Sequence, residues 1–409
     1  MKKTLPYLVS LLLTVCCFSI HMSENTNSML NNNNSIISND YLSAVVEYHN
    51  DYPAFKKRPI NTFLIKKTVA ITGVKLGQAF IIINLFFLFL SGVLVYHLSQ
   101  LFAKNNVSSL LNILFYFICF SNLFVFFKPI YTYDEPLQFC LIFLSLIALY
   151  REKWMLFILT FSLSLITRES GLILLPALLL IVTHKEGRFN CKECLNKKSL
   201  LKISYLIIPV FVYLIFLKIY LTQNNFLEIS KSDFLNRFSA YDFNLQTPKH
   251  ALESLISLFL IIGLPLYFLY NRINQKNPIP QMQQKYISAF LVTIIINSVI
   301  VLLTTQAREA RLFVIPLFFI WPIFTNLFLE DIKFIFSPKN YILVLTKWKY
   351  VAFFIFLNFL NYIFSFKAYT TTLGRPEDNY FNEYLFITLF IVITHAILKH
   401  SQHTSSNKT

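Results

Sequence analysis

Long apolar runs, separated by short polar stretches, follow one another along almost the whole chain. The runs are about 17 to 22 residues long, the length that a helix needs to cross a hydrocarbon core of about 30 Å. A transmembrane β-barrel would instead show short segments in which apolar and polar positions alternate. The pattern therefore predicts about twelve membrane-spanning helices, at residues 4–20, 77–98, 109–127, 134–150, 153–167, 170–184, 203–222, 251–270, 286–304, 312–328, 350–366 and 383–398.

The composition agrees with this pattern and excludes an ordinary water-soluble domain. Of the 409 residues, 56% are hydrophobic, and the mean hydropathy of +0.56 exceeds what one soluble core can bury. We therefore expect an all-α polytopic membrane protein with a single integral-membrane domain over residues 1–409. The first span has a basic start but no cleavage site of the A-x-A type, and we interpret it as an uncleaved signal anchor.

The distribution of basic residues predicts which side of the membrane each loop faces. Lys and Arg are enriched in cytoplasmic loops, and the short loops of this chain favour an N-terminus inside. Residues 21–76 then form the first extracytoplasmic loop, and residues 399–409 form a short cytoplasmic tail, in a multi-pass protein of the inner or plasma membrane. The net charge of +16 reflects this orientation and contact with the lipid bilayer, and we expect no nucleic-acid partner.

Charges at the ends of spans gather in the loops that we predict to lie outside. The stretches on this face are "SNDYLSAVVEYHNDYPAFKKRPI", "FFKPIYTYDEPLQF", "ITRESG", "TTQAREARLF" and "TLGRPEDNY". Four of them place a carboxylate close to an Arg or Lys, which is costly at a span end unless the charge is paired or lines a wet cavity. We therefore predict one polar cavity that opens on the extracytoplasmic side. The alternative for each single pair is a structural bridge.

The long first loop carries the first candidate site residues. Asp40 precedes an apolar stripe with helical spacing, so it could serve as a helix N-cap. A carboxylate beside the membrane surface could also accept the proton of an attacking hydroxyl, and Asp40 is our candidate general base. Arg58 and the lysines before it are suited to hold phosphate, because a guanidinium group binds phosphate through parallel hydrogen bonds. After Pro59, the segment "INTFLI" is predicted to lie along the membrane surface.

Three arginines at later span ends are further candidates for phosphate binding. Arg168, Arg308 and Arg311 could stabilise the charge that develops on a leaving lipid phosphate. The alternative is that Arg168 forms a structural bridge with its neighbour Glu169, and that Glu309 neutralises part of the charge of the other two.

Asp134 and Glu135 begin the fourth predicted span. Negative charge at this position interacts favourably with the positive end of the helix, and this could be its whole role. The alternative is that one of the two carboxylates orients the acceptor or binds a divalent ion. The sequence lacks a tight acidic cluster, and the "CKEC" stretch at 191–194 has no second pair of zinc ligands, so we expect no metal and no cofactor.

Taken in order, these stretches resemble the GT-C glycosyltransferases, which include protein O-mannosyltransferases and the aminoarabinose transferase of lipid A. The resemblance rests on the acid after the first span, the short amphipathic helix with Tyr, the "RPI" that leads to an interfacial helix, the "YDEP" motif, "RESGLILLPALLLI" and "REARLFVIPLFF". It implies an inverting enzyme that takes a hexose or pentose from a polyprenyl-phosphate donor on the outer face. The acceptor would be a glycan, a lipid or a protein. Asp40 matches the catalytic acid of the family, and Arg58 with Pro59 matches its Arg/Lys-Pro turn.

Two other functions remain open at this point. A surface-polysaccharide polymerase of the O-antigen or capsule type also has about a dozen spans, but its large loop usually comes later in the chain. A lipid-linked glycan flippase or other transporter should show broken spans or internal repeats with polar residues near the middle of the membrane. The few glycines and the concentration of charges at span ends favour the enzyme.

Overall fold

The computed structural model describes residues 4–30, 39–102, 105–120, 134–183, 197–224, 232, 236–274, 278–373 and 381–406. All the regular secondary structure within these ranges is helical, and no strand occurs in them. The all-α fold class that we predicted is therefore confirmed for the described part of the chain. The "CKEC" stretch and most of "TLGRPEDNY" lie outside it.

Each of the twelve predicted spans overlaps at least one helical segment. The α-helices are α1 (Leu5–Leu30), α2 (Asn39–Asp51), α3 (Pro53–Lys56), α4 (Pro59–Thr72), α5 (Leu76–Ser99), α6 (Asn106–Phe117), α8 (Glu135–Tyr150), α9 (Trp154–Thr167), α10 (Leu175–Thr183), α12 (Lys197–Gln223), α14 (Ala240–Leu245), α15 (Pro248–Leu258), α16 (Leu264–Asn274), α17 (Gln281–Thr304), α18 (Phe324–Ile335), α19 (Pro338–Leu345), α20 (Trp348–Tyr362) and α21 (Phe381–Ser406). The 3-10 segments are η1 (Glu169–Leu174), η3 (Ala310–Phe313), η4 (Ile315–Phe319) and η5 (Trp321–Ile323), and the π segments are η2 (Phe259–Gly263) and η6 (Ile363–Leu373).

The chain is an all-α polytopic membrane protein. Within the described residues, seven stretches are long and apolar enough to cross a bilayer: Leu76–Ser99, Ser199–Gln223, Pro248–Asn274, Gln281–Thr304, Ile315–Ile335, Trp348–Ala368 and Phe381–Gln402. The shorter apolar helices are Leu5–Ser19, Asn106–Phe117, Glu135–Tyr150, Trp154–Thr167 and Glu169–Thr183. The number of twelve spans stays a prediction.

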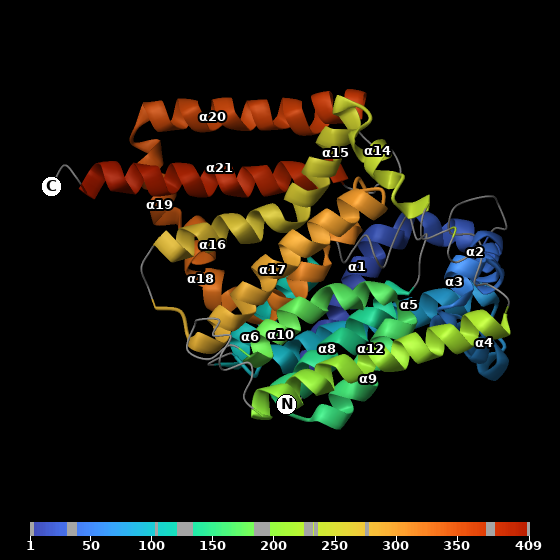
Figure 1. Ribbon diagram of the computed structural model, residues 1–409. Helices are drawn as coiled ribbons and strands as arrows, with labels where there is room; N and C mark the ends of the chain where they lie inside the picture. The colour runs from blue at the N-terminus through green and yellow to red at the C-terminus, as the bar shows by residue number, and fades with distance from the viewer. Residues whose placement is uncertain are drawn as a thin grey trace.

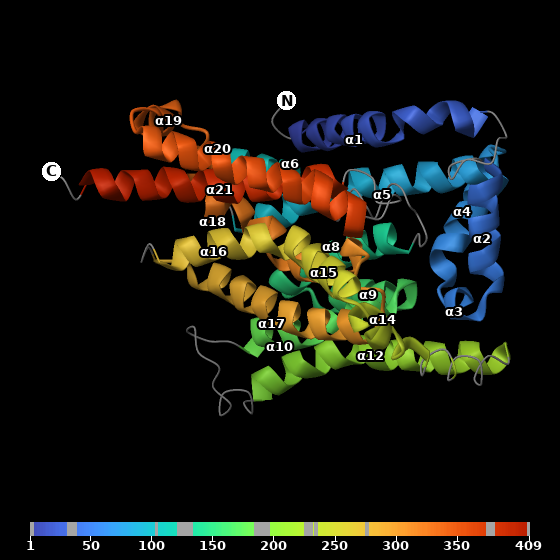
Figure 2. The ribbon, with the colours of Figure 1, turned by 90° about the horizontal axis from the view of Figure 1, so that it is seen from above.

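The long helices run side by side, and three helices of the first loop cover one end of the bundle. Figure 1 and Figure 2 both place α2, α3 and α4 at the same end, where α2 and α4 run across the direction of the long helices. Helices α2 and α4 pack on each other and on α5. We call α2, α3 and α4 together the end cap. Both ends of the described chain lie away from this cap (Figure 2).

The sequence of the end cap explains its shape. Leu42, Val46 and His49 recur at helical spacing and are all buried, so α2 presents one face to the bundle. Pro59 occupies the first turn of α4, where its missing N–H costs nothing. Gly73 ends α4 with a φ of 69°, a conformation that favours glycine and lets the chain turn into α5. The helical segment predicted after Pro59 therefore exists as α4.

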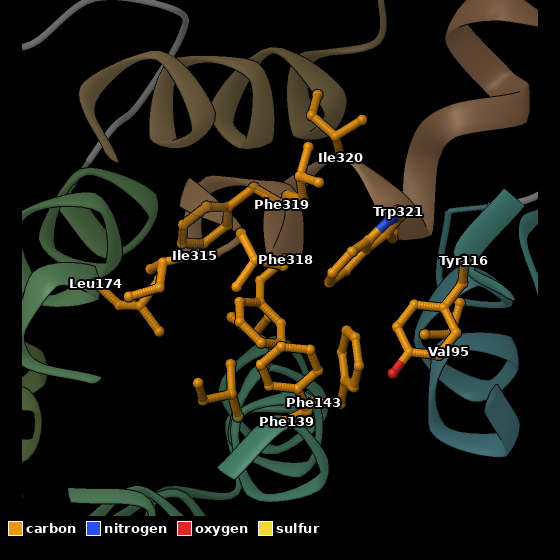
Figure 3. Close-up of a cluster of buried hydrophobic side chains, with 14 of the residues drawn as sticks. Val95, Tyr116, Phe139, Phe143, Leu174, Ile315, Phe318, Phe319, Ile320 and Trp321 are labelled. Carbon is orange, nitrogen blue, oxygen red and sulfur yellow. The ribbon is translucent and has the colours of Figure 1, made fainter. Parts of the chain in front are cut away.

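An aromatic core joins the middle of the bundle. Figure 3 shows that Phe139 and Phe143 of α8 point toward Phe318 and Trp321, which lie in η4 and η5. The Phe318 ring centroid lies 4.9 Å from that of Phe139 and 5.0 Å from that of Phe143. Tyr116 of α6 meets the Trp321 ring edge-on at 4.9 Å and donates a hydrogen bond to Ser91 Oγ. These contacts tie α6, α8 and the η segments into one packed unit.

The predicted span at 312–328 coincides with the candidate span Ile315–Ile335, but its first part is not a regular α-helix. The chain forms the three 3-10 segments η3, η4 and η5 before α18 begins, and both Pro316 and Pro322 interrupt α-helical bonding here. Such backbone is tolerated at membrane depth only where protein satisfies its polar groups. Asn112 does this at the break, because its Nδ2 donates to the Pro322 carbonyl and its Oδ1 accepts from the Thr325 N–H.

Replacing Phe318 by alanine tests the aromatic core. Phe318 is fully buried, so Phe318→Ala is expected to lower the free energy of unfolding by about 3 to 5 kcal/mol through lost packing and a cavity. The measurement is an unfolding titration in mixed micelles of a mild detergent and SDS. The control is Phe353→Ala on α20, where the ring is 51% exposed, and where we expect a change below about 1 kcal/mol. Equal losses in the two variants would contradict this description of the core.

Candidate functional site

Segments that are far apart in the sequence meet beneath the end cap through charged side chains. Arg58 is the residue before α4, Asp134 is the residue before α8, and Glu169 is the first residue of η1. Because α9 runs antiparallel to α8 and ends at Thr167, the start of α8 and the start of η1 come to the same end of the bundle. Arg311 in η3 reaches this end after α17 has ended at Thr304.

Arg58 is the centre of the charged contacts. Its Nε and Nη2 donate to the two carboxylate oxygens of Glu169 at 3.0 and 2.7 Å, and its Nη1 donates to Asp134 Oδ2 at 3.1 Å. The Arg58 side chain is 7% exposed and that of Asp134 is 1% exposed, so water screens this contact poorly. Lys57 Nζ and Arg237 Nη1 lie 3.4 and 3.5 Å from Glu169 Oε1. One carboxylate thus holds three basic side chains together.

A second set of ion pairs continues the network along the bundle end. Arg168 Nη1 lies 2.5 Å from Glu135 Oε1, and Arg311 Nη1 lies 3.6 Å from the same oxygen. Arg311 Nη2 also lies 2.9 Å from Glu309 Oε2. The expected bridge between the neighbours Arg168 and Glu169 is replaced by partners from other segments. The extended backbone at Arg168 explains this, since successive side chains of an extended chain point in opposite directions.

The network borders a cavity of about 280 Å³. Four arginines line it, namely Arg58, Arg168, Arg237 and Arg311, together with the carboxylates Glu135 and Glu169. Apolar side chains from η1, α17 and η4 form a large part of its wall, including Leu172, Ile300 and Ile315. The cavity therefore combines a cationic region with an apolar wall.

Among the described residues, the basic members of the network outnumber the acidic ones. Its basic members among the described residues are Lys57, Arg58, Arg168, Arg237 and Arg311, and its acidic members are Asp134, Glu135, Glu169 and Glu309. Five positive and four negative groups leave an excess of one positive charge. Such an excess in a partly buried site favours an anionic occupant.

Burial and ion pairing act in opposite directions on the basic residues of the end cap. Burial lowers the pKa of Lys57 below its usual value, although Glu169 opposes the effect. Burial also acts to lower the pKa of Arg58, but the nearby carboxylates of Glu169 and Asp134 outweigh it and raise the pKa above its usual value. Arg58 therefore stays charged at every physiological pH.

The structure brings most of the predicted site residues together, but not all of them. Arg58, Asp134 and Glu135 join Arg168 and Arg311 in the network, so four of the five outer stretches meet. Within the described residues, no group of three or more His, Cys, Asp or Glu side chains is placed to hold a metal ion.

Asp40, Asp134 and Arg308 are the predicted site residues that do not line the cavity. Asp134 joins the network through its contact with Arg58. Asp40 is exposed in the first turn of α2, which begins at Asn39, so Asp40 lies inside the helix and not at the predicted N-cap position. Arg308 lies over the Phe243 ring, with its guanidinium carbon 4.8 Å from the ring centroid. Neither position by itself assigns a function to these residues.

Among the lining residues that sequence reasoning missed are Gln138, Arg237 and Asn297. Gln138 and Asn297 are polar residues inside long apolar runs. A polar residue at such a position suggests a functional role, and this signal could have identified both. Arg237 lies in a polar segment of ordinary composition, where nothing distinguishes it from a solvated arginine.

Comparisons with known proteins identify no relative of this chain: no family model, no curated protein and no solved structure matches it. The site is therefore interpreted from its own residues.

Removing the charge of Arg58 tests whether it anchors the end cap. Arg58→Gln leaves Asp134 and Glu169 without their main counter-charge in a poorly hydrated site, and we expect a loss of about 3 to 5 kcal/mol of stability. The measurement is the same unfolding titration. The control is Arg237→Gln, because Arg237 is 39% exposed and contacts Glu169 at the longer distance, and its loss is expected to stay below about 1 kcal/mol. A small effect of Arg58→Gln would show that the cap is held by apolar packing alone.

Proposed function

We propose that the protein is an inverting glycosyltransferase of the GT-C type, which moves a hexose or pentose from a polyprenyl-phosphate donor to a glycan, lipid or protein acceptor. The observation that carries the proposal is the cavity at the capped end of a membrane bundle, where arginines from four separate segments meet. A lipid phosphate fits this combination, since its charge matches the cationic excess and its chain suits an apolar wall.

The end cap supports the same proposal. The resemblance to GT-C enzymes implies short helices of the first outer loop that lie along the membrane surface, and α2 and α4 cross the long helices at one end of the bundle (Figure 2). Arg58, whose guanidinium group is suited to hold phosphate and which matches the Arg/Lys-Pro turn of the family, lines the cavity beside Arg168 and Arg311.

In the proposed reaction, a hydroxyl oxygen of the acceptor attacks the anomeric carbon of the donor sugar. The bond from that carbon to the phosphate oxygen breaks, and the lipid phosphate leaves with the bonding electrons and with inversion at carbon. The arginines that line the cavity stabilise the charge that develops on the leaving phosphate. Asp40 is the proposed base for the hydroxyl proton, and it makes no ion pair with the residues that the structure describes.

The broken spans favour a second candidate, a transporter of lipid-linked glycans. The 3-10 run from η3 to η5 and the π segment η2 interrupt two predicted spans, and transporters commonly place their sites at such interruptions. The charges of the cavity, however, come from segment ends at one end of the bundle, which favours chemistry at the membrane surface.

Cysteine labelling tests the proposed extracytoplasmic position of the end cap. Ala44 is an exposed residue of α2, and Lys339 is an exposed residue of α19, away from the cap (Figure 1). In a variant without native cysteines, Ala44→Cys should react with a membrane-impermeant maleimide in spheroplasts, whereas Lys339→Cys should react only after permeabilisation. The reverse pattern would place the cap and its cavity in the cytoplasm and rule out the proposed orientation.

The lipid-linked saccharides of the native host test the reaction itself. Mass spectrometry should find that a polyprenyl-monophosphate sugar accumulates in a deletion strain and in a strain carrying Asp40→Asn, by about tenfold or more, since general-base catalysis typically contributes at least that much. The control is Asp51→Asn, which changes another exposed acid of α2 and should leave the profile unchanged.

Other outcomes of this experiment point to other functions. Accumulation of whole repeat units on polyprenyl pyrophosphate would favour a surface-polysaccharide polymerase or the transporter. A deletion phenotype without any effect of Asp40→Asn, at normal protein abundance, would remove Asp40 from the catalytic role and leave the donor proposal intact.

A further inference from the structure

The arginines that line the cavity differ in how far solvent reaches them. The side chains of Arg58, Arg168 and Arg311 are 7%, 13% and 5% exposed. The side chain of Arg237 is 39% exposed, which is the highest value in the described network, and that of its partner Glu169 comes next at 22%. The ion pair of Arg237 and Glu169 is therefore the part of the network that a ligand can reach most easily.

The same arginines differ in how closely carboxylates hold them. Each of the three buried arginines has a carboxylate oxygen within 3.1 Å. Within the described residues, the only polar contact of Arg237 runs from Nη1 to Glu169 Oε1 at 3.5 Å, longer than an ordinary N–H···O hydrogen bond of about 2.7 to 3.2 Å. A guanidinium group has several N–H donors, so most of those of Arg237 are not used by any residue that the structure describes.

Glu169 does not depend on Arg237 for its counter-charge. Arg58 donates to its two carboxylate oxygens at 3.0 and 2.7 Å, and Lys57 Nζ lies 3.4 Å from Oε1. If Arg237 moves away, Glu169 keeps two basic partners, and the loss is small because a partly exposed ion pair contributes little. The departure of Arg58 would instead leave buried carboxylates without their main partner. Arg237 is thus the arginine of the cavity that can change its partner at low cost.

A phosphate group suits the donors of Arg237. A planar guanidinium group forms two parallel hydrogen bonds to two phosphate oxygens, and such charge-assisted bonds are stronger than one long contact. The cavity of about 280 Å³ is many times larger than the space that one water molecule needs, so a phosphate group has room beside the Arg237 side chain. Exchange of the carboxylate contact for a phosphate contact is therefore favourable in both charge and geometry.

We infer that Arg237 is the arginine that contacts the phosphate of the lipid ligand directly, by exchanging its long contact with Glu169 for two hydrogen bonds to phosphate oxygens. The three buried arginines keep their carboxylate partners and act on the phosphate through their charge. In the empty site, Glu169 holds the Arg237 guanidinium at the cavity. The inference rests on the proposed function and assigns to one residue a contact that the proposal leaves open among four arginines.

Lys57 offers a matched control for Arg237. Its Nζ lies 3.4 Å from the same Glu169 oxygen that Arg237 Nη1 approaches at 3.5 Å, but Lys57 does not line the cavity. Lys57→Gln and Arg237→Gln therefore each remove one positive charge from the surroundings of one carboxylate oxygen. Only the second also removes donors that line the cavity.

The experiment measures binding by calorimetry to the full chain in nanodiscs of phosphatidylcholine. The probes are a short-chain polyprenyl monophosphate, the same polyprenol without phosphate, and inorganic phosphate. Arg237→Gln should weaken binding of the polyprenyl monophosphate by about tenfold to a hundredfold, the effect of lost hydrogen bonds to a charged group. Lys57→Gln should weaken it by less than about fivefold, because its charge acts only from a distance. Equal losses in the two variants would overturn the inference.

Arg237→Lys separates a direct contact from a general effect of charge. Lysine keeps the positive charge but lacks the planar pair of donors, so this variant should recover only part of the lost affinity. Full recovery by lysine would mean that Arg237 acts through its charge alone, and would overturn the inference. If the glutamine variant does not fold, the lysine variant decides alone, since wild-type affinity in it overturns the inference as well.

Failure of the proposed function has a different signature. If the wild type does not bind the polyprenyl monophosphate, the lipid-phosphate proposal falls and the inference falls with it, and binding of inorganic phosphate alone would then assign the cavity to a soluble anion. If the wild type and Arg237→Gln bind the polyprenyl monophosphate equally well, the donor proposal stands and the role of Arg237 alone is rejected.

Discussion

The contact of Arg58 with Glu169 and Asp134 joins parts of the chain that lie 111 and 76 residues apart in sequence. A buried guanidinium is stable only when its charge and its donors are matched, and here two carboxylates from the bundle provide both. The contact sets the position of the end cap over the start of α8 and η1. Glu169 also forms ion pairs with Lys57 and Arg237. The cationic side of the cavity therefore depends on the position of Glu169.

The other side of the cavity depends on a break in the bundle. Pro316 and Pro322 prevent a regular α-helix between α17 and α18, and the resulting 3-10 run brings Arg311 and Leu312 to the cavity. Asn112 and the aromatic core around Phe318 keep this irregular backbone buried and hydrogen-bonded (Figure 3). A continuous α-helix between α17 and α18 would have a more regular backbone, but it would not form this wall of the cavity.

Reasoning from the sequence identified most charged residues of the site, but it did not predict which of them form ion pairs with each other. Arg58, Glu135 and Arg311 were recognisable because charges at the ends of apolar runs need a reason to be there. Arg237 carried no such signal, since its segment is polar throughout. Asp40 shows the opposite problem, because a carboxylate that begins an amphipathic helix looks the same in sequence whether it only stabilises the helix end or acts on a substrate.

The lengths and order of the apolar runs determined the all-α membrane fold and brought the charged stretches to one end of the bundle, since each span reverses the direction of the chain. Which charge meets which was decided only by the tertiary structure. Arg168 and Glu169 are neighbours in sequence, yet their partners come from α8 and from the residue before α4. Short-range spacing carries no information about such contacts, because packing of distant segments sets the distances on which electrostatic energy depends.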